Sequence, residues 1–189
     1  MTVSELKNMA AAVRCDIIEM ITTANAGHPG GSLSAADIVT ALYFRVMRID
    51  PKNPTWPDRD RFILSKGHSC IALYAVMAER GYLTISELST FDAIDSRLQG
   101  HPDMTKLPGL DMSTGSLGQG LSPGIGMALG ARQHSSAGSP SRSARPAAIS
   151  SARMEAVASW SGRTTRRVAS TSSPPTPPPR TSEASTWRN

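Results

Sequence analysis

The amino-acid composition changes abruptly at about residue 132, and this change limits which part of the chain can fold. Residues 133–189 contain no Leu, Lys, Asp, Phe or Tyr, whereas they hold fourteen Ser and seven Pro. So few large apolar side chains cannot offset the conformational entropy that folding removes. The sequence therefore predicts one folded domain over residues 1–132 and a disordered tail, rich in Ser, Arg and Pro, over residues 133–189.

The charge follows the same division. Residues 1–132 carry 12 Lys and Arg against 13 Asp and Glu, so the domain is close to neutral. The tail carries 8 Arg and only Glu155 and Glu183 as acids, and the net charge of +5 therefore arises in the tail. A basic-tailed protein that binds nucleic acid is one reading. It is disfavoured, because Pro and Ser interrupt the Arg residues and no Lys accompanies them.

Hydrophobic periodicity predicts mostly helices in the domain. Helices are expected at residues 4–24, 34–47, 69–79 and 117–132, a short one from residue 84, and a buried strand at 61–65. Thr2 and Glu5 have the spacing of a capping box at the start of the first helix. Ser34 is the expected N-cap of the second helix, and Gly81 is the glycine expected to end the third. Helices that alternate with short strands predict an α/β fold, with a parallel sheet and flanking helices.

The sequence also limits the cellular setting. Cys15 and Cys70 lie far apart without metal-binding spacing, which favours a reduced, cytoplasmic protein. No apolar run approaches the ~18 residues of a membrane span. The amphipathic N-terminus does not resemble a signal peptide.

Four glycine-rich stretches carry the residues that could perform chemistry. Three contain histidine: GHPGG at 27–31, KGHS at 66–69 and GHPD at 100–103. The fourth is STGSLGQG at 113–120. His68 follows a predicted strand and precedes a helix, where open α/β sheets bind ligands and free N–H groups favour phosphate. A histidine in such a turn is more often an ordinary surface residue, so these residues alone indicate only a phosphate-containing ligand.

In this order, the four stretches resemble the N-terminal, thiamine diphosphate-binding part of transketolase, most closely the N-terminal subunit of split transketolases. The resemblance covers about residues 4–132. It implies transfer of a two-carbon ketol unit between sugar phosphates, as in the pentose phosphate pathway. It also implies that His68, Gly115 and Leu117 contact the cofactor. His28 and His101 would be catalytic, binding or polarising the sugar oxygens, and His28 could assist proton transfer.

The sequence departs from the family pattern after the glycine-rich helix. In the family, a strand, a Gly-Asp-Gly and an Asn about thirty residues later hold Mg²⁺ through oxygen ligands. This chain has no Asp after Asp111, and its only later Asn is Asn189, so the metal ligands are missing. The Glu that activates the cofactor comes from a separate C-terminal domain or subunit, across a dimer interface.

The resemblance therefore implies a C-terminal partner subunit and self-association in the intact enzyme, and an inactive chain here. The alternative is a non-catalytic remnant that still docks with that partner. The resemblance stops near Arg132, in the middle of a predicted helix. The composition beyond it is typical of out-of-frame translation of a GC-rich gene, and the alternative is a natural disordered tail that replaces the lost sequence. An incomplete domain of this kind is expected to leave apolar helix faces uncovered.

Overall fold

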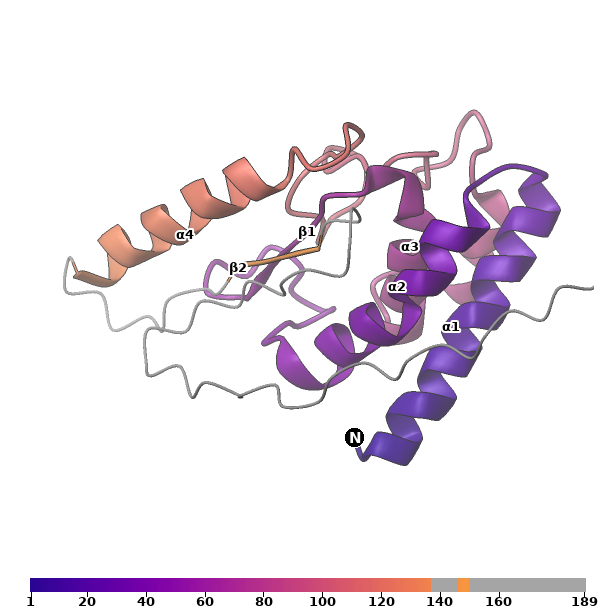
Figure 1. Ribbon diagram of the computed structural model, residues 1–189, viewed down its shortest axis with the longest axis horizontal. Helices are drawn as coiled ribbons and strands as arrows, with labels where there is room; N and C mark the ends of the chain where they lie inside the picture. The colour runs from indigo at the N-terminus through magenta and orange to yellow at the C-terminus, as the bar shows by residue number, and fades with distance from the viewer. Residues whose placement is uncertain (137–145, 150–189) are drawn as a thin grey trace, which may run out of the picture.

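The computed structural model describes residues 1–136 and 146–149 of the chain (Figure 1). The elements in chain order are α1 Val3–Ala24, α2 Pro29–Ala41, a π-helical turn η1 Leu42–Val46, β1 Arg61–Leu64, a 3₁₀ turn η2 Gly67–Ser69, α3 Cys70–Arg80, a 3₁₀ helix η3 Ile85–Thr90, α4 Leu121–Ser136 and β2 Pro146–Ile149. None of the helices in these residues has the length and hydrophobicity of a membrane span.

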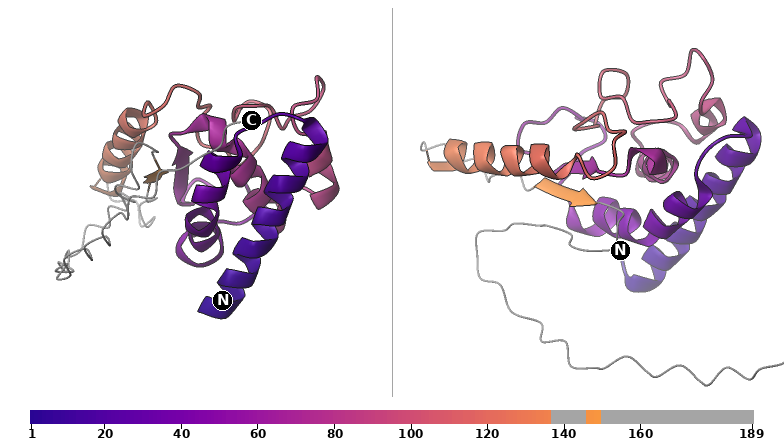
Figure 2. Two further views of the ribbon diagram at one scale, coloured as in Figure 1. Left: turned by 45° about the vertical axis from the view of Figure 1, so that its right-hand side comes forward. Right: turned by 45° about the horizontal axis from the view of Figure 1, so that its top comes forward.

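Helix α3 is the centre of the core. Every residue from Cys70 to Ala78 is buried, as expected of a helix that is apolar on all sides. Helices α1 and α2 pack against α3 and against each other (Figures 1 and 2). Helix α1 contributes one buried stripe at the helical period, formed by Ala10, Val13, Ile17 and Met20.

The two strands lie between this helical layer and α4. Strands β1 and β2 pair in parallel, with Arg61 opposite Pro146 and Leu64 opposite Ile149. Helix α4 lies on the other side of the strands from α1 (Figures 1 and 2). The described residues are thus mainly helical, with one two-stranded parallel sheet.

Several sequence predictions are confirmed. Thr2 and Glu5 form a capping box at the start of α1. The predicted strand and third helix correspond to β1 and α3, and Gly81 ends α3 in the left-handed conformation, with φ 94°.

The predicted starts of two helices were wrong. Helix α2 begins at Pro29 rather than Ser34. Proline suits the first helical position, because its fixed φ is helical and because a backbone N–H at that position would have no acceptor within the helix. The Ser34 hydroxyl donates to Gly31 O instead of capping the helix. Helix α4 begins at Leu121 rather than 117, because Gly118 adopts a φ of +86° that a helix does not allow.

The prediction of a disordered tail from residue 133 was wrong for two short segments. Helix α4 continues to Ser136, and β2 occupies Pro146–Ile149. Parallel pairing is made by backbone groups, so a segment poor in large side chains can still add to the edge of β1. The rest of the predicted tail lies outside the described residues.

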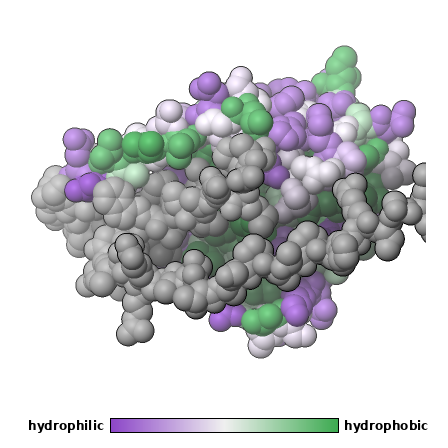
Figure 3. Space-filling model, in the orientation of Figure 1, coloured by the Kyte–Doolittle hydropathy of each residue, from purple (hydrophilic) through white to green (hydrophobic). Residues whose placement is uncertain are grey.

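Helix α4 carries a row of apolar side chains that its neighbours leave half-exposed. Leu121, Ile125 and Leu129 repeat every four residues and are 52%, 53% and 51% exposed. Figure 3 shows hydrophobic residues along the edge of the molecule formed by α4. The expectation of an uncovered helix face is met at this helix.

Asp16 on α1 is expected to make stability depend on pH. Its pKa is raised to about 6 from the ordinary 3.8, chiefly by burial and then by Glu79 and Glu19. The charged form is therefore penalised in the folded state above pH 6, and this penalty is relieved as the pH falls from 6 toward 4. The difference in pKa corresponds to at most about 3 kcal/mol, which solvent screening of this half-buried group reduces to about 1 kcal/mol.

The variant Asp16→Asn should therefore raise the free energy of unfolding by about 1 kcal/mol at pH 8, and by much less at pH 4.5. Urea unfolding followed by circular dichroism at the two pH values measures this difference. An equal gain in the free energy of unfolding at both pH values would contradict the idea that the effect comes from ionisation of Asp16.

Candidate functional site

The four glycine-rich stretches meet at the carboxyl end of β1, beginning with the 113–120 stretch. Ser65, the residue after β1, accepts a hydrogen bond from Gly118 N at its backbone oxygen (2.9 Å) and one from Gly120 N at its Oγ (2.9 Å). A Cβ at Gly120 would lie 2.6 Å from Cγ2 of Ile63. Glycine therefore lets the backbone of this stretch lie directly on the end of the strand.

The turn at 65–69 also touches the 113–120 stretch. A Cβ on Gly67 would lie 2.4 Å from the carbonyl oxygen of Thr114 and 2.8 Å from the backbone N of Gly115. Two backbones approach this closely only where one residue has no side chain. His68 follows directly, and its Nε2 lies 3.3 Å from where a Cβ on Gly31 would be, so its ring faces the turn at 27–31.

The turn at 27–31 lies against the same strand end. The rings of His28 and His68 stand edge to face, with centroids 5.3 Å apart and planes at 65°. Lys66 Nζ donates to Gly31 O (2.7 Å) and to Ser34 Oγ (3.1 Å). These contacts join the start of α2 to the end of β1.

The turn that carries His101 completes the cluster. Thr114 N donates to Pro102 O (3.3 Å), and Cδ2 of His101 lies 3.7 Å from where a Cβ on Gly115 would be. An open hollow of about 640 Å³ lies beside this turn. It is lined by Asp92, Gln99, Gly100, His101, Pro102, Asp103, Lys106, Ser113 and Thr114.

Two groups on α3 hold the backbone that leads into His101. The hydroxyl of Tyr74 donates to Gln99 O (2.8 Å), and the thiol of Cys70 donates to Gly100 O (3.2 Å). Burial raises the pKa of Cys70 to about 12, so this thiol stays protonated and can donate. Both contacts come from the buried centre of the core and therefore fix the position of this turn.

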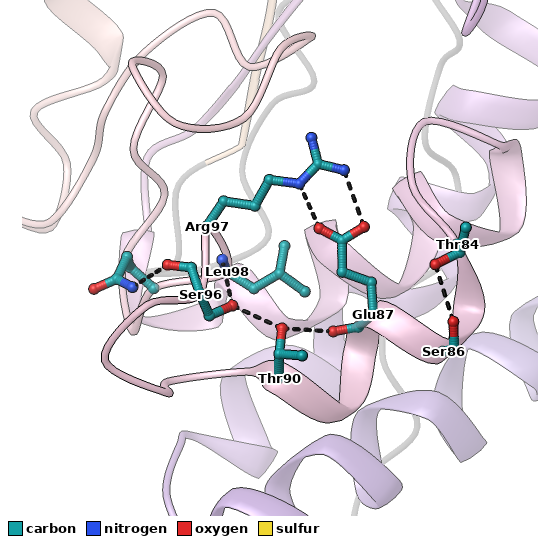
Figure 4. Close-up of polar contacts among 8 residues, drawn as sticks. Thr84, Ser86, Glu87, Thr90, Ser96, Arg97 and Leu98 are labelled. Carbon is teal, nitrogen blue, oxygen red and sulfur yellow. Dashed lines mark hydrogen bonds and ion pairs between the residues drawn. The ribbon is translucent and has the colours of Figure 1, made fainter.

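A polar network holds the preceding loop (Figure 4). Arg97 forms a two-point ion pair with Glu87, and the hydroxyls of Thr90 and Ser96 lie 2.8 Å apart. Leu98 N donates to Ser96 Oγ (2.9 Å). The network connects the loop that precedes Gln99 and Gly100, two residues that line the hollow, to η3.

The electrostatic environment of the cluster favours an anion. Burial lowers the pKa of His68, and the nearby His28, Lys66 and His101 lower it further. Burial also lowers the pKa of Lys66. An anionic ligand would relieve the repulsion among these basic groups.

Buried hydroxyl groups near these turns lack partners. Within the described residues, the Oγ atoms of Ser32 and Ser69 and the Oγ1 of Thr114 are buried without a hydrogen bond. Ser69 Oγ lies 2.4 Å from where a Cβ on Gly31 would be, so it faces the turn at 27–31. Unpaired buried hydroxyls are costly, and a ligand with oxygen acceptors would pair them.

The structure brings together most of the residues that the sequence singled out. His28, His68, His101 and Gly115 converge, whereas the side chain of Leu117 is 55% exposed. Sequence reasoning did not single out Lys66, although it lies inside the KGHS stretch. Its hydrogen-bond partners Gly31 and Ser34 lie more than thirty residues away in the sequence.

No group of three or more His, Cys, Asp or Glu that could hold a metal occurs in the part of the chain described here.

Comparison with known proteins agrees with this geometry. Residues 5–143 match the family described as transketolase, thiamine diphosphate binding domain. A protein of Clostridium sp. (strain MSTE9) named 6-deoxy-6-sulfo-D-fructose transketolase subunit SqwG is 50% identical over 125 residues, which are 66% of this chain and 46% of that protein. The transketolase of Sinorhizobium medicae is 44% identical over 65% of this chain and 18% of its own length.

Solved structures give the same result. A Pichia stipitis transketolase in complex with sedoheptulose 7-phosphate has a TM-score of 0.70 and 35% identity, over 76% of this chain and 22% of that one. The transketolase of Campylobacter jejuni has a TM-score of 0.66 and 37% identity, over 71% and 21% of the two chains. The chain thus spans less than half the length of these relatives. The match to the family over residues 5–143 shows that this chain belongs to the transketolase family, within its thiamine diphosphate-binding domain.

Proposed function

We propose that this chain provides the diphosphate-binding part of a transketolase-type site and that it is inactive by itself. The observation that supports this most strongly is the convergence of the four glycine-rich stretches on the carboxyl end of β1. Three histidines, an adjacent lysine and unpaired hydroxyls meet there. The end of a parallel strand is where α/β proteins bind phosphate groups.

The residues present fit the diphosphate of the cofactor. The hydroxyls of Ser69 and Thr114 lack partners, and the groups that depress the pKa of His68 by charge are all basic. A diphosphate offers several acceptor oxygens and negative charge, which would satisfy both features. In this proposal His68 and the backbone at Gly115 bind the diphosphate, and Leu117 packs against the cofactor.

Bound thiamine diphosphate supplies a carbanion nucleophile and an electron sink. The chain's own histidines would act on the sugar phosphate. His28 and His101 are both exposed. They would donate hydrogen bonds to the sugar oxygens, and His28 would accept or return a proton.

The metal site of the family does not fit this chain. The described residues contain no group of carboxylates and histidines suited to a metal. The sequence has Ser150 and Ser151 directly after β2, and no Asp follows Asp111. We therefore infer no step that depends on Mg²⁺. Two absences account for the proposed inactivity. The chain lacks the metal ligands, and it lacks the activating Glu, which a second subunit would supply.

The proposal includes partners and a setting. A C-terminal subunit and a second copy would complete the enzyme, in the cytoplasm, and a larger parallel sheet would flank β1. The similarity to a protein named as a transketolase subunit supports the split form. A non-catalytic remnant that docks with the C-terminal subunit is the second candidate, favoured by the half-exposed apolar row on α4.

Ligand titration tests the proposed function. The ring signals of His68 in a ¹H–¹⁵N spectrum should move when inorganic diphosphate or thiamine diphosphate reaches about 1 mM, and Mg²⁺ should not tighten this binding. A coupled assay should detect no ketol transfer, even after a C-terminal transketolase subunit is added. The variant His68→Gln lacks this imidazole, so the ring signals that disappear from its spectrum are those of His68.

Two outcomes would contradict the proposal. Unmoved histidine signals at about 10 mM diphosphate would contradict the anion site. Tight, Mg²⁺-dependent binding or activity on mixing would contradict the absence of a metal site. Co-purification of an inactive complex with the C-terminal subunit would support the second candidate instead.

A further inference from the structure

Lys66 is a buried cation at the junction of two of the turns. The residue is only 5% exposed. Its ammonium group donates to Gly31 O at 2.7 Å and to Ser34 Oγ at 3.1 Å, and Ser34 Oγ in turn donates to Gly31 O at 2.9 Å. Lys66 therefore connects the end of β1 to the first turns of α2 through a closed set of three polar contacts.

This cation has no carboxylate partner. None of the ion pairs within the described part of the chain includes Lys66. Burying an ammonium group without a counter-charge is unfavourable, and an apolar side chain of similar length would avoid the cost. A stabilising role alone therefore accounts poorly for lysine at this position, whereas a role in the adjacent cluster accounts for both its charge and its contacts.

The turn that Lys66 holds is packed closely at both ends. Gly27 adopts a φ of +118°, and a Cβ there would lie 2.4 Å from Cδ1 of Ile71. A Cβ on Gly31 would lie 2.4 Å from Oγ of Ser69. No side chain caps the start of α2, so the hydrogen bonds from Lys66 to Gly31 and Ser34 add a polar connection between the end of β1 and the helix start that follows the exposed His28.

We propose that Lys66 is the positioning residue of this site: its ammonium group fixes the turn at 27–31 on the turn at 65–69 and thereby sets where His28 stands relative to His68. This inference rests on the proposed function, because it assigns Lys66 to the same ligand site.

The charge of Lys66 has a second effect. The charged or titratable groups that act on His68 are His28, Lys66 and His101, all basic, and they lower the pKa of its ring. Neutral His68 keeps one N–H donor and one ring-nitrogen acceptor for the ligand.

The test compares Lys66→Met, which removes the charge and both hydrogen bonds, with Lys66→Arg, which keeps the charge. Lys52→Met makes the same substitution at an exposed lysine and is the matched control. Two quantities are measured on the full chain. These are the pH midpoint of the His68 ring signals and the amide hydrogen exchange of residues 30–33.

In Lys66→Met the His68 midpoint should rise, because a neighbouring positive charge is lost. The exchange at residues 30–33 should accelerate by about tenfold or more, because the turn is released. Lys66→Arg should keep the low midpoint, and Lys52→Met should change neither quantity. An unchanged midpoint and unchanged exchange in a folded Lys66→Met would overturn the proposal.

If Lys66→Met does not fold, Ser34→Ala carries the test. It removes one acceptor and leaves the lysine in place, so exchange at residues 30–33 should rise a few-fold, and no change would overturn the proposal. Diphosphate binding by the unchanged chain is measured separately. Intact diphosphate binding with unaltered exchange in these variants contradicts only the positioning role, whereas absent binding contradicts the proposed function.

Discussion

Replacing Asp111 by asparagine is expected to lower the free energy of unfolding by about 3–5 kcal/mol. Asp111 is buried and accepts hydrogen bonds from Phe62 N (2.7 Å), Arg59 Nη1 (2.9 Å) and Arg61 Nη1 (3.0 Å). The side chain of Arg59 is only 5% exposed. The asparagine variant would leave this guanidinium group buried without a counter-charge, and it would also weaken the anchor of β1. Urea unfolding followed by circular dichroism measures the loss.

Asp95→Asn is the matched control, because Asp95 is exposed in the loop before His101. It should change the free energy of unfolding by less than about 0.5 kcal/mol. If the asparagine variant at position 111 does not fold in buffer, the far-ultraviolet spectrum shows the loss directly. A cost below about 1 kcal/mol would mean that water replaces the carboxylate and that the ion pairs do not stabilise the domain.

The sequence predicted the elements whose signals are local. The capping box of α1, the apolar strand β1 and the glycine that ends α3 each depend on residues within a few positions of one another. The starts of α2 and α4 were missed because both depend on glycine-rich turns that pack against the end of β1. The backbone of such a turn is set by that packing, which the local sequence does not report.

The histidines of the site could be predicted from the sequence, whereas the residues that hold the surrounding structure in place could not. His28, His68 and His101 were recognised because they belong to a pattern that resembles transketolase, and their roles stay predictions. Asp111 was noted only as the last aspartate, since its partners Arg59 and Arg61 lie 52 and 50 residues away. Contacts of this separation follow from the packed fold and have no local sequence signal.

The predicted tail is tested only in part. The family match extends to residue 143, beyond Arg132, and β2 pairs with β1 although it lies within residues of unusual composition. Out-of-frame translation near codon 132 stays a prediction for the other residues. The coding DNA decides it, because another frame should then encode an apolar strand, Gly-Asp-Gly and a later Asn.

Replacing Gly67 by alanine is expected to disrupt the site more than any other single methyl group. The added Cβ would lie 2.4 Å from Thr114 O, 2.5 Å from Thr114 C and 2.8 Å from Gly115 N. All three are backbone atoms, so no side chain can move aside, and the two stretches must separate. We expect a loss of at least about 2 kcal/mol in the free energy of unfolding. We also expect the His68 signals to lose their response to diphosphate, because the 113–120 stretch would no longer lie against the turn that carries His68.

Gly30→Ala separates this effect from a general intolerance of the site to methyl groups. Gly30 lies in the first turn of α2, next to the same cluster, and a Cβ there meets nothing within 4 Å. This variant should be neutral or more stable by about 0.5–1 kcal/mol, because alanine favours the helix, and it should keep the diphosphate response. If both alanine variants behave alike, the close approach of Gly67 to Thr114 does not hold the stretches together. The convergence on β1 would then depend on the hydrogen bonds of Ser65 instead.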